Sequence, residues 1–267
     1  MKPKPILAFL VNLLTFSFLF TSCFPGSLIP DPYIVAENRQ KENQYYVKSA
    51  PNVPLLTEKN DISIGGVISS GNRITGVELQ AAYMAGKHIG ILGSYSHIEN
   101  GTYMKFNRYE LGSGFVTQLS KEWHFETYTG FGNGKIKNTH YTGISNLDLA
   151  HIFIQPAIAV SNAKKTVQFA FVSRFERVNF KVNDTLFDTA REPMNTNQVK
   201  KLYDQRFHIM WQPGILFRFG WQKFIFQSGY SYSADLSNSK IYGSKGNFSL
   251  GILFRFNTGE KNSLKEQ

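Results

Sequence analysis

The residues of this sequence best suited to chemistry are acidic and basic side chains set within apolar, aromatic-rich stretches. Alternation along those stretches places them on the less apolar face. An isolated buried charge is very costly, so such groups must be paired or hydrated. We therefore expect either an ion-pair network that fills an interior or the lining of a narrow polar conduit. The set is Glu78, Glu110, Glu126, Glu176, Arg174, Arg206, Arg218 and Arg255, with His88, His124, His151 and His208 on the same faces.

Acid–histidine pairs are the sequence's nearest approach to a catalytic arrangement. Asp148 lies three residues before His151, and Asp204 lies four before His208. Partners on one face of a strand are two residues apart, so neither pair is aligned. No His-x-Ser arrangement is present that would favour acyl hydrolysis. We expect no enzymatic activity, with a barrel enzyme or small-ligand binder as the alternative.

Metal, cofactor and nucleic-acid sites are not indicated. No two histidines have zinc-ligand spacing, and GFGNGK at residues 130–135 runs from a predicted strand into a loop, unlike a phosphate-binding loop. The chain has 29 Lys+Arg against 19 Asp+Glu, a net charge of +10, but its basic residues are scattered and form no nucleic-acid stripe. Those in the predicted outer loops are either solvated loop charges or suited to the phosphates of lipopolysaccharide. They are Lys181, Lys200, Lys201, Lys240 and Lys245.

Ten segments of alternating apolar and small or polar residues must position these side chains. A period of two indicates strands with two different faces. The apolar faces are rich in aromatic residues, which is typical of a lipid-facing surface. We predict an all-β fold, a closed antiparallel up-and-down transmembrane β-barrel of about 10 strands. The segments begin near Ile62, Ile74, His88, Arg108, Glu122, Ala150, Thr166, Gln205, Lys223 and Asn247.

Connections between the segments alternate in predicted length. Residues 85–87, 120–121, 162–165 and 220–222 form short turns, whereas 98–107, 133–148, 181–204 and 234–246 form long loops. Outer-membrane barrels have short periplasmic turns and longer outer loops. This pattern places both chain ends on the periplasmic side. The alternative is a soluble periplasmic β-barrel lipoprotein.

The N-terminal region predicts export and anchoring. Lys2 and Lys4 precede an apolar run over residues 6–20, which is too short to span a bilayer and is typical of a secretory signal. Cys23, the one cysteine of the chain, follows it at a lipobox-like position and is the predicted lipidation site. The expected organisation is a signal peptide (1–22), a periplasmic tether (23–59), the barrel (60–258) and a C-terminal tail (259–267).

A family resemblance rests on several sequence segments: the Cys23 signal, NVPLLTEKNDISIGG, GVELQAAYM, FETYTGFGNGKIKN and FIQPAIAV. With these the chain resembles the small lipoprotein-type outer-membrane β-barrel proteins of the Bacteroidota. The resemblance implies the barrel fold and a location in the bacterial outer membrane, and we therefore expect contact with outer-membrane lipids and an N-terminus anchored on the periplasmic side. The final GILFRF also looks like the signal read by the barrel-insertion machinery. The expected role is structural, surface-interacting or narrow-pore, and the oligomeric state is left open.

Overall fold

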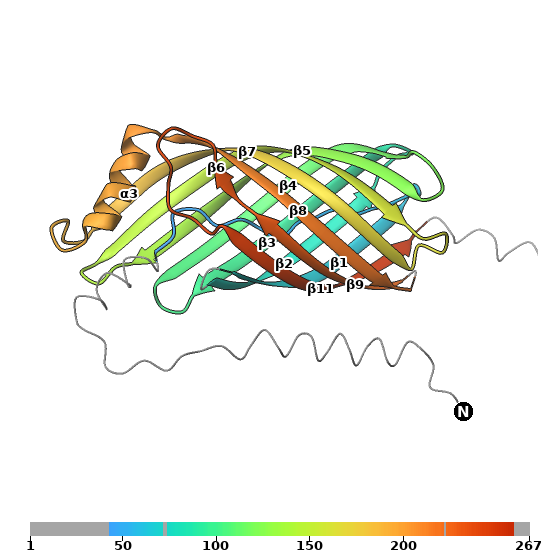
Figure 1. Ribbon diagram of the computed structural model, residues 1–267, viewed down its shortest axis with the longest axis horizontal. Coiled ribbons are helices and arrows are strands. Elements are labelled where there is room, and N and C mark those ends of the chain that lie inside the picture. Colours follow the sequence, from blue (N-terminus) through green and yellow to red (C-terminus); the bar gives the residue numbers. More distant parts are fainter. Residues whose placement is uncertain (1–42, 72–73, 222, 259–267) are drawn as a thin grey trace, which may run out of the picture. The chain divides into compact units, whose positions relative to one another are not determined.

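The computed structural model describes residues 43–71, 74–221 and 223–258. Within these ranges, ten long strands form one antiparallel sheet that closes into a barrel (Figure 1). They are β1 (Asp61–Gly71), β2 (Ile74–Met84), β3 (Ile89–Asn100), β4 (Met104–Gln118), β5 (Trp123–Thr139), β6 (Ile144–Ser161), β7 (Val167–Leu186), β8 (Phe207–Gly220), β9 (Phe224–Tyr232) and β11 (Gly246–Asn257). A two-residue strand, β10 (Ala234–Asp235), pairs with β8.

The barrel closes through the first and last strands. β1 pairs with β11 from Asp61↔Asn257 to Ser70↔Phe248, and β9 joins β11 to β8. Closure satisfies the backbone groups that an open sheet edge would expose. The predicted fold class is confirmed. Among the predicted strand starts, the one for β6 differs most from the structure, because β6 begins at Ile144 and not near Ala150.

Side chains alternate between the two faces of the barrel wall. On β8, Phe207 and Ile209 are exposed outwards, whereas His208 and Met210 are buried inwards. The same division runs along the other long strands in the described ranges, because successive residues of a strand point to opposite faces, except at the end of β7, where residues 183–186 are all exposed. An apolar exterior thus encloses a mixed polar and apolar lumen.

The two ends of the barrel differ in their connections. Short turns join β2–β3, β4–β5, β6–β7 and β8–β9 at one end, named the turn end, where β1 also begins and β11 ends. The other end, named the loop end, carries the long β7–β8 and β9–β11 connections. Figure 1 shows the helix of the β7–β8 connection at the loop end, far from the short turns.

Two of the predicted long loops are wrong. The expected loops at 98–107 and 133–148 are largely strand, because β3 and β4 continue to a turn after Asn100, and β5 and β6 continue to a turn after Thr139. The alternation persists there with the faces kept: Lys105 and Lys137 point outwards and Phe106 and Ile136 are buried. These strands therefore extend further at the loop end than predicted.

The long β7–β8 connection, predicted as a loop, contains a helix, α3 (Pro193–Asp204). Pro193 begins it, where a missing N–H costs nothing. Val199 and Leu202, three residues apart, are buried on one face. Among the described residues, no helix combines the length and the apolar character needed to cross a membrane.

Candidate functional site

The interior of the barrel is occupied by residues 43–56 of the chain itself, named the lumen segment. Tyr46 is 1% exposed, and Val53 and Leu56 are 0% exposed. Of these residues only Ser49 is partly exposed. The prediction of a tether over residues 23–59 is therefore wrong for the lumen segment, which is packed inside the barrel. Cys23, the signal peptide and the C-terminal tail lie outside the described residues.

The lumen segment runs from the loop end to the turn end. Near its start, the Tyr45 hydroxyl donates to Asn195 Oδ1 of α3 at 3.0 Å. Near its end, the Leu55 N–H donates to Glu126 Oε2, close to the start of β5, at 3.1 Å. The chain then reaches Asp61 and enters β1 at the turn end. Both chain ends were predicted to lie on the periplasmic side, and the termini themselves lie outside the described residues. Within the described ranges, β11 ends at the turn end, whereas the lumen segment begins at the loop end.

The barrel wall supplies the hydrogen bonds that an extended segment would otherwise find in a sheet. Pro51 and Pro54 have no N–H to satisfy, and inward polar side chains bond the neighbouring backbone groups. This explains why glutamate, glutamine and arginine recur on the inner faces of the strands. The contacts are Ala50 N to Glu78 Oε1 (2.7 Å), Gln155 Nε2 to Asn52 O (2.7 Å), and Arg218 Nη1 and Arg255 Nη2 to Pro54 O (3.1 and 3.0 Å).

A central charge cluster lies beside the lumen segment and consists of Arg108, Glu110, His151, Arg174 and Glu176. Arg108 Nη2 lies 2.5 Å from Glu176 Oε1, and Arg174 Nη2 lies 2.6 Å from Glu110 Oε1. Arg108 also pairs with Glu110, and Arg174 with Glu176. His151 Nε2 lies 3.0 Å from Glu110 Oε1. The two carboxylates and two guanidinium groups balance one another, which the low dielectric of a buried site requires.

Strand geometry builds this cluster. Arg108 and Glu110 are two residues apart on β4, and Arg174 and Glu176 are two apart on β7, so each pair shares the inner face of its strand. The Arg174 guanidinium also lies 3.9 Å from the centroid of the Phe153 ring, a cation–π distance. The cluster is therefore held by three strands, β4, β6 and β7.

The predicted lumen residues separate into groups. Glu110, Arg174 and Glu176 meet in the central charge cluster, and Glu78 binds the lumen-segment backbone at Ala50. Glu126, Arg218 and Arg255 gather near the turn end around Pro54 and Leu55. These residues share one role, since each of them bonds to the lumen segment or to the cluster beside it.

One predicted lumen residue is wrong and one was missed. Arg206 is exposed in the connection between α3 and β8, because β8 begins only at Phe207. Arg108 is 1% exposed and belongs to the cluster. Its position two residues before Glu110 was the available signal, because the period of two places both on the inner face.

Three cluster members have the chemistry of metal ligands. Oxygen atoms of Glu110 and Glu176 and a ring nitrogen of His151 all lie within 4.8 Å of one another. The guanidinium groups of Arg108 and Arg174 bond both carboxylates. With two cations already placed there, the donor set favours ion pairing over binding a further cation.

A hydrophobic core closes the barrel at the loop end. Tyr45 and Tyr46 of the lumen segment pack with inward side chains of the extended strands and with α3. The core joins three parts of the chain that are far apart in sequence, so it fixes α3 and the lumen segment over the mouth. Its larger members are Phe106, Ile136, Leu149, Phe180, Leu202 and Met210.

The loop-end core, α3 and the start of the lumen segment together close this mouth of the barrel and are named the cap. Glu192, just before α3, connects the cap to the β5–β6 connection. Its Oε1 accepts from the N–H and the hydroxyl of Thr142, each at 2.8 Å, and its Oε2 accepts from Asn195 Nδ2 at 2.8 Å. His140 Nδ1 lies 3.1 Å from the same Oε2. Burial lowers the pKa of His140 below its usual value, although the Glu192 carboxylate opposes that shift.

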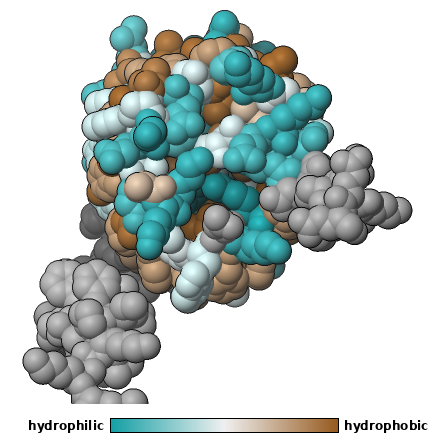
Figure 2. Space-filling model, turned by 90° about the vertical axis from the view of Figure 1, so that its right-hand side faces the viewer, coloured by the Kyte–Doolittle hydropathy of each residue, from teal (hydrophilic) through white to brown (hydrophobic). Residues whose placement is uncertain are grey.

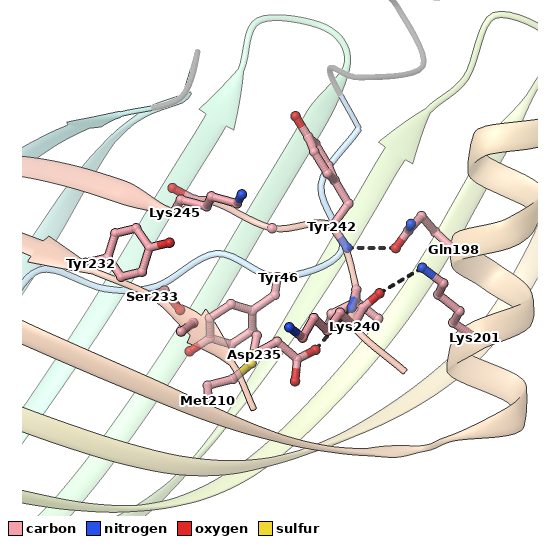
Figure 3. Close-up of a pocket in the computed structure, with 14 residues that line it drawn as sticks. Tyr46, Gln198, Lys201, Met210, Tyr232, Ser233, Asp235, Lys240, Tyr242 and Lys245 are labelled. Atoms are coloured by element: carbon pink, nitrogen blue, oxygen red, sulfur yellow. Dashed lines mark hydrogen bonds between the residues drawn. The ribbon is translucent and has the colours of Figure 1, made fainter. Parts of the chain in front are cut away.

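A cavity of about 390 Å³ opens between α3 and the β9–β11 connection. Figure 3 shows Tyr46 at its lumen side, with Gln198 and Lys201 reaching from α3. Gln198 Oε1 accepts from the Tyr242 N–H at 2.7 Å, and Lys201 Nζ donates to Lys240 O at 3.0 Å (Figure 3). These bonds hold the connection against α3, so the cavity forms part of the cap.

The outer surface of the wall is an apolar band with an aromatic belt toward each end. The rings of Tyr95 and Tyr109 are in tilted contact at 4.8 Å between centroids toward the loop end, and those of Phe224 and Phe254 meet edge to face at 5.4 Å near the turn end. Figure 2 shows the turn end face on, with hydrophilic side chains over its middle and hydrophobic ones toward its margin. Beyond the belt at the loop end the outward residues become charged or polar. They include Lys105, Lys135, Lys137, Arg177, Asn179 and Lys181.

Comparisons with known proteins give remote structural likenesses. No family model and no curated protein matches the sequence. The translocator domain of autotransporter NalP from Neisseria meningitidis is similar at 10% identity and a TM-score of 0.43, over 76% of this chain and 90% of that one. The N-terminal β-barrel domain of Pseudomonas aeruginosa OprF has 9% identity and a TM-score of 0.38, over 74% and 98%. Ail, the attachment invasion locus protein of Yersinia pestis, has 16% identity and a TM-score of 0.33, over 74% and 100%. The fold assigned here rests on the chain's own strand pairing.

Proposed function

We propose that the protein is a bacterial outer-membrane β-barrel whose lumen is closed by its own chain, and which acts through the surface at its loop end. The apolar band between two aromatic belts supports the membrane location, because a barrel in water would expose that band at high cost. The charged outward residues beyond the loop-end belt match strands that project out of a bilayer. Outer-membrane barrels have short turns on the periplasmic side and longer loops on the outer side, so the loop end is assigned to the outside.

The burial of the lumen segment is the observation that best supports a closed lumen. A pore needs a continuous aqueous path, but the lumen segment, the central charge cluster and the loop-end core fill the interior along its length. The carboxylates and guanidinium groups that could line a conduit are bonded to one another or to the segment. The proposed role is therefore a non-enzymatic, surface-interacting one, and the narrow-pore role is set aside.

Conductance in planar bilayers tests this proposal. We expect the purified full-length protein to give no single-channel steps. A variant in which a Gly/Ser sequence of equal length replaces residues 44–56 removes the side chains that fill the lumen, and should conduct. Heat-modifiable gel mobility of both proteins would show that each barrel is folded. Regular conductance steps from the wild type would contradict the closed state.

Membrane location is tested separately by extraction. We expect the protein to stay with the membrane fraction in carbonate and to need detergent for release. Unboiled and boiled samples should migrate differently on a detergent gel. Release by carbonate alone would point to the soluble periplasmic barrel instead.

Lipopolysaccharide is the proposed partner at the loop-end edge of the apolar band. Lys105 and Lys137 are direct cross-strand partners on the outward face, and like charges in that relation repel unless an anion lies between them. Lipid phosphates would supply that anion. Purified lipopolysaccharide should bind the wild type more tightly than the Lys105→Gln/Lys137→Gln variant. Lys121→Gln/Lys164→Gln, at the turn end, is the matched control.

Two further parts of the proposal come from the sequence. Lipidation of Cys23 would add a lipid anchor to the barrel, and the final strand would be read by the barrel-insertion machinery. Labelled fatty acid that appears on the wild type and equally on a Cys23→Ala variant would refute the anchor.

A further inference from the structure

We infer that the chain passes through the barrel from the outside inwards, so that the residues before Asn43 are displayed on the cell surface. The inference rests on the proposed membrane orientation and adds a direction of threading to it. It differs from the expectation of a periplasmic N-terminal anchor.

The start of the lumen segment is fixed at the loop end by contacts from two sides. Asn43 Nδ2 lies 3.0 Å from Nδ1 of His140, in the β5–β6 connection. On the other side the Tyr45 N–H donates to Tyr242 O at 2.9 Å, and Tyr46 forms a parallel bridge with Gly243. The chain therefore begins its passage between two connections of the loop end.

The middle of the passage is held in register with the wall. Lys48 Nζ donates to Ser231 O of β9 at 2.7 Å, and the Ser49 hydroxyl lies 3.0 Å from that of Ser96 on β3. Contacts further along the segment fall progressively closer to the turn end, from Glu78 at Ala50 to the Glu126 carboxylate at Leu55. The order is monotonic, so the segment makes one pass and does not double back.

The turn end fixes the other terminus of the passage. The N–H groups of Thr57 and Glu58 both donate to Asp61 Oδ2, at 3.1 and 3.0 Å, directly before β1. Leu56 is buried among Met84, Val116 and other inward residues at this end. Since β1 begins here, Asn43, at the other terminus of the lumen segment, lies at the opposite mouth.

The same epitope inserted at three positions tests the inference in intact cells. One insertion lies between Gln40 and Lys41, one after Gly101 in the β3–β4 turn at the loop end, and one after Lys164 in the β6–β7 turn at the turn end. Binding of antibody and removal by added protease are measured before and after the outer membrane is permeabilised. We expect the insertions at Gln40 and Gly101 to be reached in intact cells, and the one at Lys164 only after permeabilisation.

The outcomes separate the inference from the proposed function. If antibody and protease reach the insertion after Gly101 but neither reaches the one after Gln40 in intact cells, outward display is overturned while the membrane orientation stands. If the insertions after Gly101 and Lys164 behave alike, or in reverse, the orientation itself fails, and the inference fails with it.

Discussion

The hydroxyl group of Tyr46 donates a hydrogen bond of 2.7 Å to Oε2 of Glu176, which joins the lumen segment to the central charge cluster. The same hydroxyl accepts from Gln212 Nε2 at 2.6 Å. A single phenol thus connects the segment to β7 and β8. The closed lumen and the paired charges are consequently one structure, and a change in either should be felt by the other.

Replacing Tyr46 with phenylalanine should destabilise the barrel by about 1–3 kcal/mol, because it leaves a buried carboxylate oxygen and an amide without a partner. The temperature at which the unboiled form converts to the unfolded form on a gel measures the change. Tyr109→Phe, on the outward face, is the control and should shift that temperature little. Equal behaviour of the two variants would contradict the proposed link.

Arg108→Met should lower the free energy of unfolding by about 3–5 kcal/mol, since it leaves Glu110 and Glu176 sharing one guanidinium group. Arg206→Met should change it by about 0.5 kcal/mol or less, because that side chain is exposed. Denaturant unfolding in detergent micelles compares the two. A larger effect at Arg206 would refute the assignment of Arg108 to the cluster.

Cysteines at Ser49 and Ser96 should form a disulfide, since the two hydroxyl oxygens lie 3.0 Å apart and a sulfur pair needs only a small approach. Thiol counting with and without reductant detects it, with the native Cys23 as a constant background. The pair Ser49→Cys/Ser113→Cys should stay reduced, because Ser113 faces outwards. Oxidation of both pairs alike would argue against the position of the lumen segment.

The cap at the loop end should weaken in mild acid. Burial lowers the pKa of His140 in the folded state, so the unfolded cap binds the proton more readily. The stabilisation is complete above the unfolded pKa of about 6.5 and is lost as pH falls through the lower folded value. Hydrogen exchange of the α3 amides at pH 7.5 and 5.5 measures this. His140→Gln should reduce the difference, and a variant with an unchanged pH response would contradict the assignment.

The alternation of apolar and polar residues predicted the barrel, because the two faces of each strand meet different surroundings. The type of each residue therefore indicates which face it lies on. The prediction failed at strand ends: exposed Arg206 lies directly before Phe207, where β8 begins, and β4 begins at Met104, four residues before Arg108. The lumen segment was missed for a different reason. Its backbone is bonded by wall side chains from several strands, so neighbouring positions meet unlike partners and no period appears. Helix α3 is short, and only Val199 and Leu202 with Asn195 are buried on it.

The passage of the chain through the closed ring also constrains the order of assembly. If the seam between β1 and β11 closed before the lumen segment entered, the chain would have to be drawn through the closed ring to reach its place. A seam that closes around a segment already in place avoids this step, and the inward side chains of the wall can then bond the segment as the strands register. Along that route the closure of the ring and the filling of the lumen coincide, so it passes through no empty barrel.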